Sequence, residues 1–368
     1  MPTIQKDTVL IFRLGSIGDT VVALPCFHAI ARAFPRHRRV LLTNSLRSVR
    51  ASSAESVLDG TGLIQEVIYY PAGFSIRLAV NLRREIRRLD PQLLIYLAER
   101  MRPAPVLRDL AFFKAAGIPR IVGVPWKRSL RACRLDPVTG ELEYEAQRLA
   151  RNLMPALLVS LSPDNWDLRL SAEERARVDA LIDPAAGGKP LLAIAPGARL
   201  PAKDWGTSRW SALLKSLAAE LHGVALLIVG APDERSLCED LARQWAGPVV
   251  NLCGLIPPRE AAAALGRCHL MVCHDSGPMH LAAAQGTRCV ALFGDYNRPR
   301  KWFPFGPGHH VLHDPRGVRE ICVEKVAGIV RSEFAGAGRA AVQECGAVTY
   351  FGSGDSVPQR VGVHFQQP

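Results

Sequence analysis

Short apolar runs alternate with longer amphipathic segments along most of the chain, and this alternation predicts parallel α/β layers. In the first part, the pattern predicts strands at residues 8–14, 39–43, 65–70, 92–97 and 120–123. Helices are expected at residues 20–34, 46–58, 76–89, 105–116 and 142–161. Residues 1–161 are therefore predicted to form one doubly wound domain.

The polar segment 162–190 holds Pro163, Pro184 and a Gly187–Gly188 pair, which predicts an interdomain linker around a short helix. The alternation then restarts, with strands expected at residues 191–196, 225–229, 249–252, 269–273 and 289–293. Helices are expected at residues 208–221, 234–245, 259–266, 278–285 and 318–332. Residues 191–334 thus form a second domain, and residues 335–368, without clear periodicity, are expected to be a loose tail. Two such domains bind ligands in the cleft between them, at the carboxyl ends of their strands.

Composition narrows the class of protein. With 48% hydrophobic and 22% charged residues the chain is globular, and its longest apolar runs fall far short of the ~20 residues that span a bilayer. The first residues, MPTIQKDTVLIFRL, lack the features of a signal peptide, so we expect a cytoplasmic protein. Nine cysteines without a CxxC pair predict reduced thiols.

The net charge of +12 is unevenly placed. Residues 1–151 hold 24 Lys and Arg against 13 Asp and Glu, a net of +11, and residues 152–368 hold 22 against 21, a net of +1. This asymmetry predicts an anionic partner for the first half: nucleic acid, anionic lipid or a phosphorylated substrate. No aromatic-basic RNA motif, zinc finger or DNA-reading motif accompanies the charge, which disfavours nucleic acid.

The first loop with candidate chemistry is RLGSIGD, directly after the first expected strand. Gly15 and Gly18 permit a tight turn, and Asp19 follows at the start of a helix. Asp19 either caps that helix or acts as a general base at the edge of the cleft. The glycine spacing is not GxGxxG, so a nicotinamide dinucleotide site is disfavoured.

Two further loops follow strands of the second half. In PGARLPAKDW, Lys203 either neutralises a phosphate or is a solvated surface lysine. In VGAPDE, Glu234 either favours a helix dipole at the start of a helix or bonds to ribose hydroxyls.

The fourth loop, CHDSGPMH, joins an expected strand to a helix that opens with Pro278. Free amides around Ser276 and Gly277 would form an anion site at that helix N-terminus. A zinc site was considered because cysteines and histidines crowd together here: Cys268, His269, Cys273, His274 and His280. Their spacing fits neither CxxC nor HExxH, and no GxSxG occurs, so a zinc site and a serine hydrolase are both disfavoured.

Taken in order, these four blocks resemble the glycosyltransferase family that contains the ADP-heptose:lipopolysaccharide heptosyltransferases, glycosyltransferase family nine. RLGSIGDTVVALPCFHAIARAFP looks like that family's opening strand, SxGD loop and helix. PGARLPAKDWGTSRW, VGAPDER and HDSGPMHLAAAQGTRCVALFG are similar to its three donor-side loops. The stretch DYNRPRKWFPFG departs from the family's usual turn. The resemblance extends over residues 8–330 and implies a GT-B fold, two Rossmann-like domains that face a central cleft.

The resemblance also implies roles for individual residues. Asp19 matches the family's proposed catalytic base, Lys203 the lysine at the donor diphosphate, and Glu234 the acid near the nucleoside. The donor-binding turn is matched by Asp275, Ser276, Gly277 and His280. The acceptor is implied on residues 1–161 and the sugar nucleotide on residues 191–334.

We therefore expect an inverting glycosyltransferase that moves heptose from ADP-heptose to the lipopolysaccharide inner core. No DxD sequence occurs, so no metal or other cofactor is expected. Arg100 and Arg102 are candidate contacts for the anionic acceptor, and peripheral contact with the inner membrane is compatible with the basic first half. The alternatives are a family member with another donor or glycan acceptor, and a non-catalytic sugar-nucleotide-binding protein.

Overall fold

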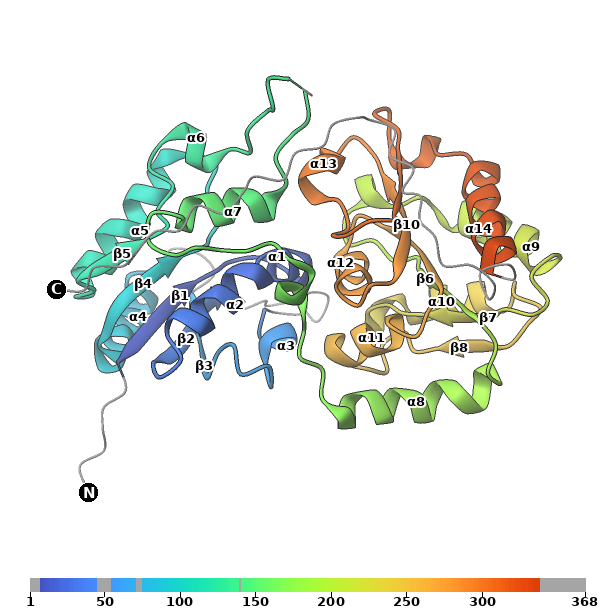
Figure 1. The fold of residues 1–368 in the computed structure, drawn as a ribbon, viewed down its shortest axis with the longest axis horizontal. Coiled ribbons are helices and arrows are strands. Elements are labelled where there is room, and N and C mark those ends of the chain that lie inside the picture. The colour runs from blue at the N-terminus through green and yellow to red at the C-terminus, as the bar shows by residue number, and fades with distance from the viewer. Residues whose placement is uncertain (1–6, 45–53, 71–74, 139, 338–368) are drawn as a thin grey trace.

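A computed structural model describes residues 7–44, 54–70, 75–138 and 140–337. These residues form two α/β halves that lie side by side (Figure 1), each built on its own parallel sheet. The expected α/β class is therefore confirmed. Across the described ranges, no helix combines the length and the apolar character needed to cross a bilayer.

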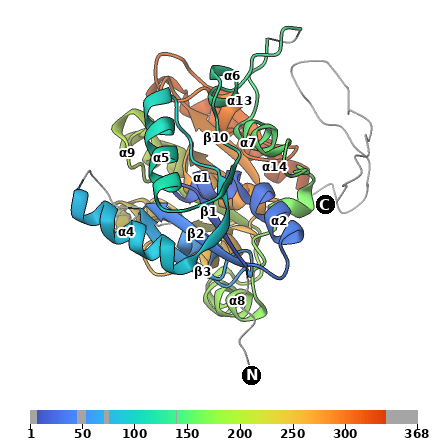
Figure 2. The same cartoon turned by 90° about the vertical axis from the view of Figure 1, so that its left-hand side faces the viewer.

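The first half holds a five-stranded sheet in the order β3-β2-β1-β4-β5. Its strands are β1 (Thr8–Phe12), β2 (Arg38–Asn44), β3 (Glu66–Tyr70), β4 (Pro91–Tyr96) and β5 (Arg120–Val122). Its helices are α1 (Ile17–Val22), α2 (Leu24–Ala33), α3 (Glu55–Leu58), α4 (Ile76–Leu89), α5 (Pro103–Ala115), α6 (Arg128–Arg131) and α7 (Glu145–Leu153). Figure 2 looks onto this half and shows α4 and α5 on its outer face.

The second half holds a six-stranded sheet in the order β11-β10-β9-β6-β7-β8. Its strands are β6 (Leu191–Ala195), β7 (Ala225–Ile228), β8 (Val249–Asn251), β9 (Leu270–His274), β10 (Arg288–Phe293) and β11 (His310–His313). Its helices are α9 (Thr207–Ala218), α10 (Arg235–Ala242), α11 (Pro258–Leu265), α12 (Gly277–Ala284), α13 (Pro299–Trp302) and α14 (Val323–Ala337). A 3₁₀ turn, η1 (Pro163–Trp166), and helix α8 (Ala172–Ala186) connect the halves.

The central strands are apolar on both faces because helices cover both sides of each sheet. Every residue of β1 and of β6 is buried. In β1, Val9 and Ile11 pack into the core beneath α1 and α2, while Leu10 and Phe12 pack into the core beneath α4 and α5. Unbroken apolar runs of this kind are typical of parallel strands buried on both faces.

The ten expected strands are confirmed, with ends displaced by two residues at most. The expectation missed β11, a four-residue strand at the edge of the second sheet. The expected helix at 142–161 was too long, because α7 ends at Leu153. Of the expected helix at 46–58, Glu55–Leu58 is helical and residues 45–53 lie outside the described ranges.

The end of the second half also differs from the expectation. A 3₁₀ turn at Val318–Glu320 precedes α14, which continues to Ala337. The expected tail from residue 335 is therefore helical at its start, and residues 338–368 lie outside the described ranges. The eight cysteines of the described ranges are free, in agreement with the expected reduced thiols.

Helix α8, within the segment expected to be a linker, packs on the second half. The side chain of its N-cap Ser171 accepts a hydrogen bond from the Glu174 backbone N–H, and the Glu174 carboxylate accepts one from the Ser171 N–H, a capping box. Glu174 also binds Arg259 of α11, whose guanidinium donates to the carbonyl oxygens of Val57 and Leu168. The Arg259 side chain thus ties α8, α11 and the first half together.

The two halves also meet where helices α1 and α12 begin. A Cβ on Gly18 would lie 2.8 Å from Cδ2 of His280, and a Cβ on Gly277 would lie 3.1 Å from Cβ of Ile17. Glycine at positions 18 and 277 therefore permits this close approach. Farther out, Lys301 of α13 donates to Glu99 after β4 at 2.5 Å. The carboxyl ends of the two sheets consequently face one another.

Candidate active site

The turn after β1 places Asp19 at the start of α1. Helix α1 begins at Ile17 with Ser16 as N-cap, so Asp19 is its third helical residue, and its carboxylate caps the helix start as part of a capping box. Oδ2 of Asp19 accepts hydrogen bonds from the Ser16 N–H at 2.7 Å and from the Ser16 hydroxyl at 2.8 Å. Gly15 has a φ of +147°, and a Cβ there would overlap the Asp19 side chain. Only glycine leaves room for the carboxylate to turn back toward the Ser16 N–H.

A buried arginine lies beside this carboxylate. Arg13 donates to the Leu97 carbonyl at 2.8 Å and to the Asp19 carbonyl at 2.5 Å, and its Nη2 lies 3.8 Å from Oδ1 of Asp19. Burial alone raises the pKa of the Asp19 carboxyl, but the Arg13 guanidinium and the Ser16 hydrogen bonds outweigh it and hold the pKa below its ordinary value. Asp19 is therefore ionised at neutral pH and can accept a proton.

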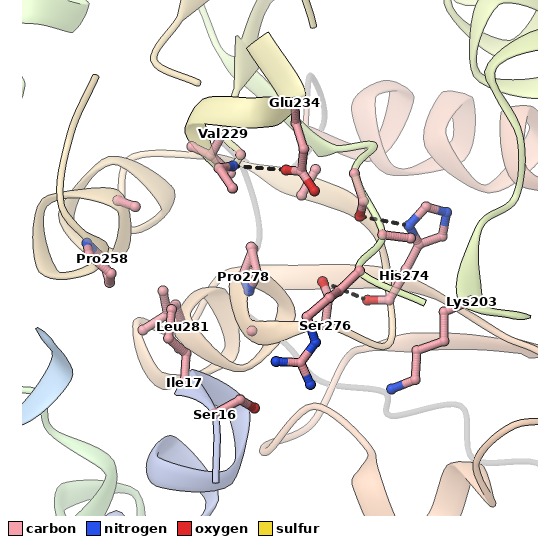
Figure 3. A pocket seen from close by; sticks show the side chains of 18 of the residues that line it. Ser16, Ile17, Lys203, Val229, Glu234, Pro258, His274, Ser276, Pro278 and Leu281 are labelled. Carbon is pink, nitrogen blue, oxygen red and sulfur yellow. Dashed lines mark hydrogen bonds between the residues drawn. The ribbon is translucent and has the colours of Figure 1, made fainter. Parts of the chain in front are cut away.

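A cavity of about 260 Å³ lies between this turn and the second half. Three loops at the carboxyl ends of β6, β7 and β9 form most of its wall, and the start of α12 forms another part. In Figure 3, Glu234 lies at one side of the cavity, Ser16 and Ile17 of the first half at the other, and the start of α12 between them. Of the candidate residues, Lys203, Glu234, Asp275, Ser276 and Gly277 line this cavity.

Lys203 forms part of the cavity wall with most of its side chain covered. Its ammonium donates to Oδ2 of Asp275 at 2.8 Å and to the Asp275 carbonyl at 3.1 Å. The same carboxylate oxygen accepts from the Asn297 amide at 2.5 Å, and the Lys203 ammonium stands over the Tyr296 ring at 5.1 Å. Lys203 is therefore a positioned charge at the cavity and not an open surface lysine.

Glu234 reaches back across the loop that precedes it. Its Oε2 accepts a hydrogen bond from the Ala231 N–H at 2.8 Å. A Cβ on Gly197 would overlap the Glu234 carboxylate, and a Cβ on Gly230 would lie 2.8 Å from its Oε2. Glycine at both positions therefore gives the carboxylate its place between the loops after β6 and β7.

The buried His274 joins two of these loops. The Trp205 N–H donates to its Nε2 at 3.1 Å, so Nδ1 carries the proton and donates to the Gly197 carbonyl at 3.2 Å. Burial lowers the pKa of His274 to about 4, and the ring is neutral at pH 7. Both ring nitrogens are thus engaged by backbone groups. No cluster of three or more His, Cys, Asp or Glu suited to a metal ion occurs within the described ranges.

Four candidate residues are not among those that line the cavity: Asp19, described above, His280, Arg100 and Arg102. His280 is buried beside Gly18, with its ring 6.4 Å from that of Trp302, and burial lowers its pKa to about 4. Arg100 and Arg102 lie on the first half, after β4. Arg100 is bound by the buried Asp109, and Arg102 is exposed at the N-cap of α5.

Several groups at this site have no signal in the sequence that predicts their role. Arg13 stands in the quoted first loop, but nothing in its position predicts complete burial beside Asp19. Asn297 lies in the stretch that departs from the family pattern. The pair Glu99–Lys301 joins residues 202 positions apart, a contact without any local pattern.

Comparison with known proteins gives a consistent result. The sequence model of glycosyltransferase family 9 (heptosyltransferase) matches residues 110–325. The lipooligosaccharide heptosyltransferase 2 of Haemophilus influenzae is 34% identical over 115 residues, which are 29% of this chain and 32% of that protein. The match thus spans about a third of that relative's length.

Solved structures share the fold at lower identity. The ADP-heptose LPS heptosyltransferase II of Escherichia coli has a TM-score of 0.64 at 19% identity, covering 90% of this chain and 99% of that chain. The E. coli heptosyltransferase WaaC with ADP has a TM-score of 0.62 at 16% identity, covering 89% and 99%. These similarities confirm the expected GT-B fold.

Proposed function

Since the chain belongs to glycosyltransferase family 9, we propose that it is an inverting heptosyltransferase, which transfers heptose from ADP-heptose to the lipopolysaccharide inner core. One observation carries the proposal. The cavity lined by Lys203, Glu234 and the start of α12 is also lined by Ser16 and Ile17, from the turn that holds Asp19. A donor bound to the second half would thus present its sugar to a carboxylate of the first half.

Asp19 is assigned the general base. Its carboxylate takes the proton from the acceptor hydroxyl as that oxygen attacks the anomeric carbon, on the side opposite the departing diphosphate, so the configuration inverts. The lowered pKa of Asp19 keeps it ionised and ready to accept the proton, and the Ser16 hydrogen bonds fix its orientation. General-base catalysis of this kind contributes about 10²–10⁴-fold.

The negative charge that develops on the departing diphosphate is assigned to Lys203 and the start of α12. The backbone amides around Ser276 and Gly277 lie at the N-terminus of α12, where the positive end of the helix dipole would stabilise a bound anion. Asp275 holds the Lys203 ammonium at the cavity wall. Glu234 is placed to accept hydrogen bonds from ribose hydroxyls. In this proposal protein cations and amides perform the role that a divalent metal fills elsewhere.

The acceptor is assigned to the first half, which carries nearly all of the net positive charge. A phosphorylated and carboxylated lipid core complements that charge. We place the protein in the cytoplasm, with peripheral contact to the inner membrane. Helix α4 supports such contact, since it displays the arginine-rich segment 83–88 together with Ile76, which is 74% exposed, and Val80, 38% exposed. Co-sedimentation with anionic and with zwitterionic vesicles tests this contact, and equal binding to both would contradict it.

A donor screen with the purified full chain tests the proposed activity. ADP-heptose, GDP- and UDP-linked sugars, and ADP-linked hexoses are each incubated with lipopolysaccharide core acceptors that lack heptose. Transfer from ADP-heptose with inverted anomeric configuration supports the proposal. Transfer from another donor alone identifies a family member with different specificity. Tight donor binding without transfer indicates the non-catalytic alternative.

A further inference from the structure

The first half has its own topological switch point at the carboxyl ends of β1 and β4. The strand order β3-β2-β1-β4-β5 places these two strands side by side while the chain leaves them toward opposite edges of the sheet. Ligands of open α/β sheets bind at such a switch point. Arg100 follows β4, and its guanidinium carbon stands 5.9 Å from the ring centroid of Phe12, the last residue of β1. The neighbouring Glu99 contacts Lys301 of the second half, so Arg100 directly follows a residue at the boundary between the halves.

A fully buried carboxylate, Asp109 of α5, holds Arg100 there. Its Oδ2 accepts from Nε of Arg100 and from the Tyr96 hydroxyl, both at 2.9 Å. Its Oδ1 accepts from Nη2 of Arg108 at 2.9 Å and from the Tyr70 hydroxyl at 3.2 Å. Burial and the nearby Asp109 raise the pKa of both tyrosines, which therefore remain protonated donors. The cluster holds two cations and one anion, which leaves one positive charge in excess.

The two arginines use Asp109 differently. Arg108 donates hydrogen bonds to the carboxylate from both Nε and Nη2, and its side chain is 51% exposed. Arg100 donates to the carboxylate from Nε alone, and its side chain is 19% exposed. Nη2 of Arg100 is buried and has no hydrogen-bond partner within the described ranges. A buried donor without an acceptor is costly, so the site favours a ligand that supplies an oxygen.

We propose that Asp109 is a positioning residue that, with Tyr96 and Tyr70, fixes Arg100 as the guanidinium that binds an oxyanion of the acceptor. Because Nε is engaged by Asp109, a ligand would meet the end of the guanidinium that carries the two Nη nitrogens, and an oxygen that enters the site beside the buried Nη2 would give it the partner that it lacks. That end matches the two oxygens of a phosphate or a carboxylate. The inference rests on the proposed function in one respect, that the acceptor is anionic. It distinguishes Arg100 from Arg102, which has no hydrogen bond to a buried carboxylate among the residues that the structure describes.

The test compares Arg100→Lys with the matched control Arg108→Lys, which alters the other cation on the same carboxylate. Equilibrium binding of lipopolysaccharide core oligosaccharide is measured without donor, so the outcome does not depend on transfer. Steady-state kinetics with the same acceptor then separate KM from kcat. Asp109→Asn removes the orienting charge, and Tyr96→Phe removes one hydrogen bond from the carboxylate while keeping the ring, which covers the case that Asp109→Asn does not fold.

We expect Arg100→Lys and Asp109→Asn to weaken acceptor binding about tenfold or more, the loss typical of a hydrogen-bonded charge pair, with kcat and the donor KM nearly unchanged. Tyr96→Phe should weaken it by a smaller factor, and Arg108→Lys by less than about threefold. Equal effects of Arg100→Lys and Arg108→Lys would overturn the inference, as would a fall in kcat alone.

Modified acceptors identify the oxyanion. Wild-type protein and Arg100→Lys are compared on core oligosaccharide that has been dephosphorylated and, separately, on oligosaccharide whose carboxyl groups have been reduced. If either treatment removes the difference between the two proteins, the inference is supported and the partner of Arg100 is the group removed. If the difference persists after both treatments, Arg100 binds no acceptor oxyanion and the inference fails. A wild-type protein that binds this oligosaccharide but transfers nothing would contradict the proposed function and leave this comparison intact.

Discussion

Asp19→Asn is the change that separates catalysis from structure most cleanly at this site. The amide oxygen can take the place of Oδ2 and keep both hydrogen bonds from Ser16, so α1 should still begin at the same residue. The amide nitrogen then replaces Oδ1, the atom 3.8 Å from Nη2 of Arg13. Arg13 keeps its bonds to the Leu97 and Asp19 carbonyls but loses the neighbouring anion. We expect a loss of unfolding free energy of about 1–3 kcal/mol, measurable in urea.

The expected loss of activity is larger. Removal of a general base should slow transfer by about 10²–10⁴-fold, or about 3–5 kcal/mol in the barrier. Single-turnover transfer at saturating donor and acceptor measures this step, and donor binding should stay within about twofold of the wild type. Because the pKa of Asp19 is held below its ordinary value, its titration should also leave the wild-type rate flat across the neutral pH range.

Ser16→Ala is the matched control for this variant. It removes the hydroxyl bond to Asp19 but keeps the carboxylate and the backbone bond, so the rate should fall by less than about tenfold. If Asp19→Asn transfers as fast as Ser16→Ala, the carboxylate only caps α1 and the assignment of Asp19 as base is wrong.

Gly197→Ala should displace the Glu234 carboxylate and raise the donor KM by about tenfold without changing the acceptor KM. The control Gly223→Ala, where an added Cβ would meet no atom within 4 Å, should change neither KM. Steady-state kinetics with each substrate varied measure both values, and equal behaviour of the two variants would contradict the role of Glu234. Transfer should survive EDTA, and inactivation that a single divalent ion reverses would show that a metal shares the leaving-group charge. The free energy of unfolding should fall as the pH drops from about 6.5 to about 4. Burial lowers the pKa of His274 and His280 to about 4, so the unfolded chain binds more protons than the folded protein in that pH range. Urea unfolding measured across this pH range tests the prediction, and a constant unfolding free energy would contradict it. Raising salt should weaken acceptor binding more than donor binding, since the Debye length falls from about 10 Å at 0.1 M to about 3 Å at 1 M, and equal salt slopes for the two substrates would exclude a basic acceptor face.

The sequence alone was sufficient for the strands and for the order of the loops. Central parallel strands are buried on both faces, so runs such as Leu191–Ala195 must be apolar throughout and stand out from the amphipathic helices. The edge strand β11 has one buried residue among four, His310–His313, and such a short pattern cannot be told from a loop. The end of α7 at Leu153 was likewise missed, because packing, and not helix propensity, decides where a short helix ends.

The loops that line the cavity could be located from the sequence because each follows a strand, and the carboxyl ends of parallel strands lie at one edge of a sheet. Lys203, Glu234 and Ser276 are separated by dozens of residues, yet the order of the strands suffices to bring them to that edge. What these side chains do there required the tertiary structure. The contact of Lys203 with Asp275, and the overlap that makes Gly197 necessary beside Glu234, depend on how loops distant in sequence pack against one another.

The tertiary structure also decided which charges of the basic first half have a fixed place. By sequence, Arg100 and Arg102 are equivalent cations after one strand, and Asp109 is an ordinary acidic residue in a helix. In the fold, Asp109 is fully buried and accepts a hydrogen bond from Nε of Arg100, while Arg102 remains exposed. Hydrophobic periodicity determines which face of a helix is buried, but the partner of a buried charge depends on how strands and helices distant in sequence are packed. The sequence therefore determined the sheets and the position of the cleft, and only the packing of β1, β4 and α5 decided which guanidinium is held at its edge.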